Sequence, residues 1–66
     1  MCLSTLYEIK GGERKKLGDY ISNVISRDGV YVFTDVMGEE ISVKGKIRSL
    51  DLVKNEITIE VEQQAG

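Results

Sequence analysis

The residues with the clearest chemical potential stand at the start of the chain, where Met1 is followed by the sole cysteine, Cys2. The Cys2 thiolate, its own amide nitrogen and the α-amine of Met1 can form one chelate. Because the ordinary pKa is about 7.7–8.0 for an α-amine and about 8.5 for a thiol, a competing metal can deprotonate both near neutrality. Sulfur and nitrogen donors in one plane suit Ni(II) or Cu(II). Cys2 and Met1 are therefore the candidate metal ligands.

A second copy of the chain would complete this donor set, since one chain offers a single sulfur. If the first strands of two subunits meet across a twofold axis, each Cys2 faces its symmetry mate. A metal on the axis would then have two sulfur and two nitrogen ligands. The same geometry would allow a disulfide between subunits under oxidising conditions. The alternative interpretation of Cys2 is a small buried hydrophobic residue without a ligand role.

The sequence does not indicate catalytic chemistry. The chain has no histidine, which removes Ser-His-Asp and Cys-His arrangements. Gly11-Gly12 lacks the surroundings of a phosphate-binding loop and is typical of a hairpin turn. Glu39 and Glu40 are adjacent, so on a strand they point to opposite faces and cannot easily share a proton. We expect no catalytic residues, no organic cofactor and no enzyme activity.

Size and composition predict one small domain over residues 1–62 and a frayed tail over 63–66. A chain of 66 residues buries little surface on folding, and a single cysteine excludes an intrachain disulfide framework. A dimer interface or a bound metal would add the stability that a core of this size lacks. No signal peptide or membrane-spanning run is evident, so we expect a cytoplasmic protein. The net charge of −2 does not favour a nucleic-acid partner.

The hydrophobic pattern has period two, which indicates strands. Residues 56–62 ("EITIEVE") alternate most strictly, residues 2–9 form a first strand, and residues 29–36 form another after an Asp28-Gly29 hairpin turn. Residues 16–28 are ambiguous, and we expect two short strands there because Gly18 and the β-branched residues disfavour a helix.

Residues 39–53 contain a change of phase. Ile41, Val43 and Ile47 have odd numbers, whereas Leu50 and Leu52 have even numbers. A β-bulge near Arg48-Ser49 would bring both sets to the core, and a bend is expected at Gly45. These elements together predict an all-β fold, a small barrel of the SH3 or Sm type with about 5–7 short antiparallel strands.

Basic residues support a second interpretation of function. Lys44, Lys46 and Arg48 share one outward face, which can protect a sheet edge or hold phosphates. Tyr31 and Phe33 are the single aromatic pair that could stack on bases. An RNA-binding or protein-interaction barrel with a structural cysteine is therefore the alternative function.

The sequence resembles the CooT family over about residues 1–62. The signals are Met-Cys at the start, a TD-x-x-GEE turn and a G-x-I-x-x-x-D-L strand, which correspond here to Met1-Cys2, Thr34-Asp35, Gly38-Glu39-Glu40, Gly45, Ile47, Asp51 and Leu52. The resemblance implies a homodimeric accessory protein that binds Ni(II) through Cys2, with Met1 as co-ligand. The implied partner is a nickel-dependent carbon monoxide dehydrogenase or its maturation proteins. Members of this family have also been labelled RNA-binding proteins.

Overall fold

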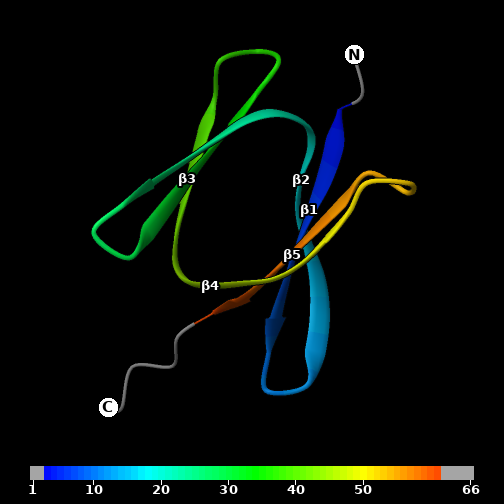
Figure 1. The fold of residues 1–66 in the computed structure, drawn as a ribbon, viewed down its shortest axis with the longest axis vertical. Coiled ribbons are helices and arrows are strands. Elements are labelled where there is room, and N and C mark those ends of the chain that lie inside the picture. Colours follow the sequence, from blue (N-terminus) through cyan, green and yellow to red (C-terminus); the bar gives the residue numbers. More distant parts are fainter. Residues whose placement is uncertain (1–2, 62–66) are drawn as a thin grey trace.

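Five β-strands form a closed barrel in the computed structural model, which describes residues 3–61 (Figure 1). The strands follow one another around the ring in chain order: β1 (Ser4–Lys10), β2 (Glu13–Arg27), β3 (Val30–Asp35), β4 (Glu40–Asp51) and β5 (Glu56–Val61). The prediction of a small all-β barrel is confirmed. Within residues 3–61 there is no helix long and apolar enough to cross a membrane.

The ring closes through a parallel pair of strands. Successive strands are antiparallel neighbours, but β1 and β5 run in the same direction, with Leu6 opposite Ile57 and Glu8 opposite Ile59. The amino-terminal ends of β1 and β5 therefore lie together at one end of the barrel, and their carboxyl-terminal ends lie together at the other.

β2 is one bent strand, so the expectation of two short strands over residues 16–28 is wrong. Its first half pairs with β1, where Gly18 is opposite Leu6, and its second half pairs with β3, where Val24 is opposite Phe33. Between the halves, Tyr20 has a φ of 57° and the register shifts. The strand itself bends here, and the chain passes from pairing with β1 to pairing with β3 without a turn.

β4 confirms the predicted bend and bulge. It pairs first with β3 and then with β5, and its register shifts between Ile47 and Ser49. At Gly45 the backbone of β4 lies against the Glu60 carbonyl, in space that a Cβ would occupy. The expectation that the even-numbered leucines join the core is wrong, because Leu50 is 56% exposed and Leu52 is 84% exposed. Leu50 lies near the end of β4, and Leu52 lies in the following turn.

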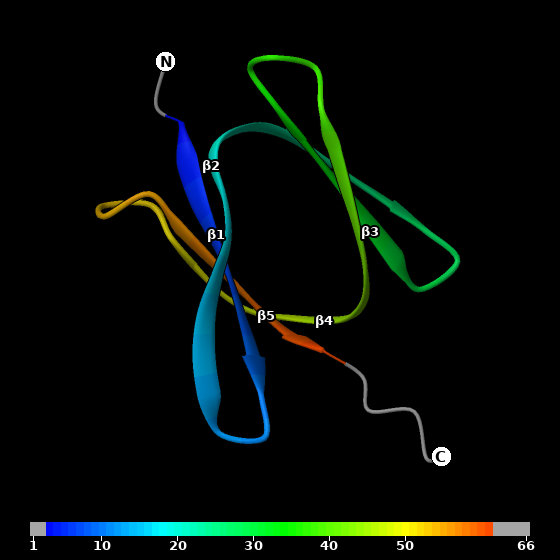
Figure 2. The same ribbon diagram turned by 180° about the vertical axis from the view of Figure 1, so that it is seen from behind.

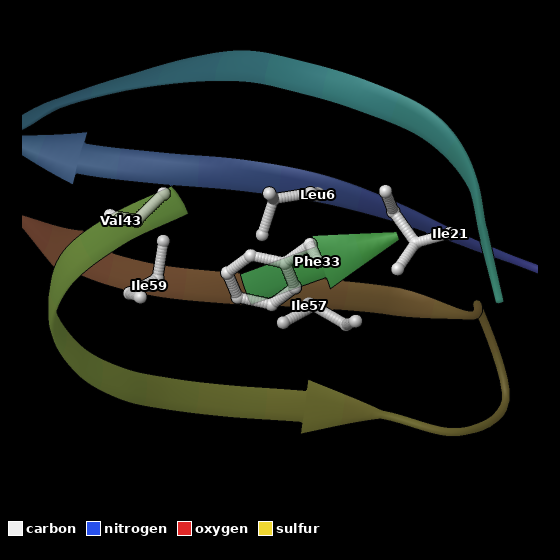
Figure 3. Packing of buried hydrophobic residues seen from close by; sticks show 6 residues of the cluster. All are labelled: Leu6, Ile21, Phe33, Val43, Ile57 and Ile59. Atoms are coloured by element: carbon white, nitrogen blue, oxygen red, sulfur yellow. The ribbon is translucent and has the colours of Figure 1, made fainter. Parts of the chain in front are cut away.

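The core takes at least one buried side chain from every strand. Figure 3 shows the ring of Phe33 at its centre. Leu6, Phe33 and Ile59 are fully enclosed. The buried cluster comprises Leu6, Ile21, Phe33, Val43, Ile57 and Ile59, and Leu17, Tyr31, Ile41 and Val61 pack against it. A core this small leaves the barrel dependent on the close strand contacts that enclose it.

The bend at Gly45 can be tested by substitution. Gly45→Ala places a methyl group against the Glu60 backbone and must separate β4 from β5, so we expect a loss of at least about 3 kcal/mol in the free energy of unfolding. Gly12→Ala is the control, because its methyl group meets no atom within 4 Å and its cost of about 1–2 kcal/mol comes only from the positive φ of 83°. Urea unfolding measures both variants, and equal midpoints would contradict this role for Gly45.

Candidate metal centre

Met1 and Cys2 lie outside the described residues, so the ligand prediction stays a prediction. The structure does describe the residues that follow them. Leu3 is half-buried, and β1 begins at Ser4. The position at which the chain enters the barrel is therefore defined by the contacts of residues 3–5.

The start of β1 is held on both sides. Ser4 is opposite Ile21 of β2, and the Thr5 amide donates a hydrogen bond of 2.9 Å to the Asn55 carbonyl, just before β5. The Thr5 hydroxyl also donates to Asp19 Oδ1 at 3.3 Å. Contacts from two neighbouring elements thus hold Ser4 and Thr5 in place.

Asp19 connects Thr5 at the start of β1 to the side chain of Lys16. Its Oδ2 lies 2.9 Å from Lys16 Nζ. The hydrogen bond from Lys16 is the main reason that the pKa of Asp19 lies below its ordinary value, and the same bond raises the pKa of Lys16. Asp19 therefore stays ionised, but Lys16 and Thr5 already occupy its oxygens.

Two turns flank the start of β1, and an aspartate organises each. Asp35 Oδ1 accepts hydrogen bonds from the amides of Met37 at 2.8 Å and Glu39 at 3.0 Å. Asp51 Oδ1 accepts from the amides of Lys54 at 2.9 Å and Val53 at 3.0 Å. These bonds, that from Lys54 above all, lower the pKa of Asp51. Both carboxylates serve to shape turns.

Exposed apolar side chains stand in the two turns that flank the start of β1. Tyr20 precedes Ile21, and its carbonyl accepts a hydrogen bond from the Val36 amide, which places the first turn beside β2. The second turn ends at Asn55, which bonds to Thr5. Both views show the turn after β3 and the turn after β4 on either side of the start of β1 (Figures 1 and 2). We call the exposed apolar residues here the apolar rim: Tyr20, Val36, Met37, Leu52 and Val53.

The hydrophobic pattern of the sequence did not predict the apolar rim, although the apolar residues in its turns are an indication of it. Met37 is 84% exposed and Val53 is 92% exposed, and both stand in turns, where polar residues are usual. Because these side chains contribute nothing to the core, they are free to meet another surface. These exposed apolar residues are therefore candidates for contact with another surface.

Donor atoms for a metal are scarce in the described part of the chain. Residues 3–61 contain no group of three or more His, Cys, Asp or Glu side chains that could hold an ion. The full sequence has no histidine and one cysteine. Glu39 and Glu40 are exposed. Cys2 is the one thiol in the sequence that a soft or borderline metal could use.

The aromatic pair predicted for the alternative RNA-binding surface is not available to bind bases. Lys44, Lys46 and Arg48 are exposed along β4, as expected. Phe33, however, is fully buried, and its ring centroid lies 6.3 Å from that of Tyr31. The prediction that Tyr31 and Phe33 could stack together on bases is wrong, because strand alternation turns Phe33 into the barrel.

Comparison with known proteins gives a family and a fold. Residues 1–60 match the model of a family described as CO dehydrogenase accessory protein CooT. No curated protein matches the sequence. A crystal structure assigned as a CooT from Carboxydothermus hydrogenoformans is similar, with a TM-score of 0.85 and 21% identity, over 94% of this chain and 100% of that chain. At this identity the structural likeness shows a shared fold.

Acid should remove the contribution of Asp51 to stability. Because folding lowers its pKa, that contribution is present above the ordinary value of about 3.9 and is lost as the pH falls through the lower value of the folded state. Asp51→Ala should lower the thermal midpoint at neutral pH, and the difference from the wild type should shrink below about pH 4.

The control is Glu40→Ala, because no hydrogen bond to the Glu40 side chain exists among residues 3–61. Calorimetry across this pH range measures both differences. A constant deficit for Asp51→Ala at every pH would show that its carboxylate does not act through charge.

Proposed function

The chain belongs to the CooT family of CO dehydrogenase accessory proteins, and on that premise we propose that it is a nickel-binding homodimer that assists nickel insertion. One observation carries the proposal: the chain has a single thiol, Cys2, which follows Met1 and stands two residues before the first residue of β1, Ser4. Ni(II) is the cargo, and a nickel-dependent carbon monoxide dehydrogenase or its maturation proteins receive it.

The donor chemistry favours a metal shared between two chains. Each chain supplies the Cys2 thiolate and one backbone nitrogen, from Met1 or from Cys2. Two such sets give a sulfur and nitrogen environment that suits Ni(II) in a square plane. A free thiol needs a reducing compartment, so we place the protein in the cytoplasm.

The apolar rim supports the dimer and its symmetry. In a twofold contact the same surface meets itself, so residues near the axis meet their own copies. The turns that carry the rim flank the start of β1, so a contact across them would bring the two copies of β1 toward each other. Burial of the exposed Leu52 and Val53 would also compensate for the small core.

A position between subunits also suits delivery. A metal enclosed within one barrel could leave only by unfolding of strands, whereas a metal between two subunits becomes accessible when they separate. The carboxylates of Asp35 and Asp51 are engaged in their turns and need not move. The barrel can therefore remain intact while nickel is handed over.

Nickel titration tests the ligand assignment. The wild type should develop thiolate-to-nickel charge-transfer absorption that saturates at one metal per two chains. Cys2→Ser should abolish this absorption, because a hydroxyl is a poor ligand for Ni(II) at neutral pH. Ser4→Ala is the control, since it alters a neighbouring hydroxyl and keeps the thiol. Unchanged nickel affinity in Cys2→Ser would reject the site.

The apolar rim can be tested separately. The double substitution Leu52→Asp and Val53→Asp puts two charges into the proposed contact, so the dimer dissociation constant should rise by more than about tenfold. Lys54→Gln is the control, because it alters the same turn and leaves the rim intact. Sedimentation equilibrium measures association and circular dichroism checks the fold. A dimer that withstands the double substitution would place the interface elsewhere.

A further inference from the structure

A cleft of about 700 Å³ opens at the end of the barrel opposite the start of β1. Because β1 and β5 are parallel, their carboxyl-terminal ends meet there, and β4 runs antiparallel beside β5. This volume falls within the range of small-molecule sites, about 300–1,000 Å³. Its lining comes from β1, the β1–β2 turn, β4 and β5: Ile9, Lys10, Gly11, Gly12, Gly45, Lys46, Arg48, Glu60 and Val61.

The cleft is locally basic in a chain that carries a net charge of −2. Lys10, Lys46 and Arg48 face one carboxylate, Glu60. Arg48 Nη1 and Glu60 Oε2 lie 3.6 Å apart, with both side chains more than half exposed. Among residues 3–61, neither lysine forms an ion pair, although Glu13 is opposite Lys10 in the hairpin register. Two cations are therefore left to attract an anion.

The remaining lining determines which kind of anion fits. The Gly11-Gly12 turn has no side chains, and a Cβ on Gly12 would meet no atom within 4 Å, so its backbone is open to a close approach. Ile9 and Val61 add apolar surface. Among residues 3–61, no aromatic side chain lines the cleft, so bases have nothing to stack on. These features favour a compact, multiply charged molecule over a nucleic-acid strand.

We propose that this cleft binds a small organic polyanion bearing phosphate or carboxylate groups. The planar guanidinium of Arg48 can donate two parallel hydrogen bonds to either group, and the two lysines act as flexible point charges. Glu60 competes with the ligand for Arg48 at their 3.6 Å contact. The proposal concerns residues at the end of the barrel opposite the start of β1 and does not depend on nickel binding.

Two probes distinguish the sources of the anion: pyrophosphate for phosphate groups and citrate for carboxylate groups. Each is titrated into the ¹⁵N-labelled full chain at low salt, and backbone amide shifts are followed. We expect saturable shifts at Gly11, Gly12 and Gly45 for at least one probe. Gly29 and Gly38, which do not line the cleft, should not shift. The probe that binds identifies the chemical class, and no saturation by either probe in the millimolar range would overturn the proposal.

Matched variants separate a built site from diffuse attraction. Lys46→Gln should weaken binding about tenfold. Lys44→Gln removes an exposed lysine of the same strand that lies outside the cleft, and it should leave the affinity within about twofold. Glu60→Gln should tighten binding, because it frees Arg48. Equal weakening by Lys44→Gln and Lys46→Gln, or weaker binding in Glu60→Gln, would refute the proposal.

Discussion

The parallel pairing of β1 with β5 is the constraint on which the arrangement of the molecule depends. It closes the ring, and it places the amino-terminal ends of both strands at one end of the barrel and the carboxyl-terminal ends at the other. The closure requires β2 and β4 to bend and pair with two neighbours each. Gly45 permits the bend in β4 because its missing side chain leaves room for the Glu60 carbonyl.

This closure gives the two ends of the barrel different chemistry. The turns that carry the apolar rim flank the start of β1, so this end of the barrel offers exposed apolar side chains to another surface. The opposite end carries the basic cleft, whose Lys46 and Arg48 favour small anions. An accessory protein that held a metal between subunits at one end could bind an anion at the other end without breaking the dimer.

Much of the fold could be predicted because strand alternation is local. The strands over residues 56–61 and 30–35, the Asp28-Gly29 turn and the phase change near Arg48 were all indicated by the sequence. The continuity of β2 could not be predicted, since a bend at Tyr20 preserves the strand only when neighbours on both sides supply hydrogen bonds. Leu50 and Leu52 could not be placed either, because alternation does not reveal where a strand leaves the core.

The candidate site could likewise be predicted only in part. The prediction that Met1 and Cys2 are metal ligands rests on residue types alone, whereas the rim and the cleft could be located only once strands distant in sequence were brought together. The most direct test of the central claim is native mass spectrometry of the nickel-loaded protein. We predict a species of two chains with one nickel ion, which reverts to nickel-free chains in Cys2→Ser. A single chain that retains its own nickel ion would contradict a metal shared between two Cys2 thiolates.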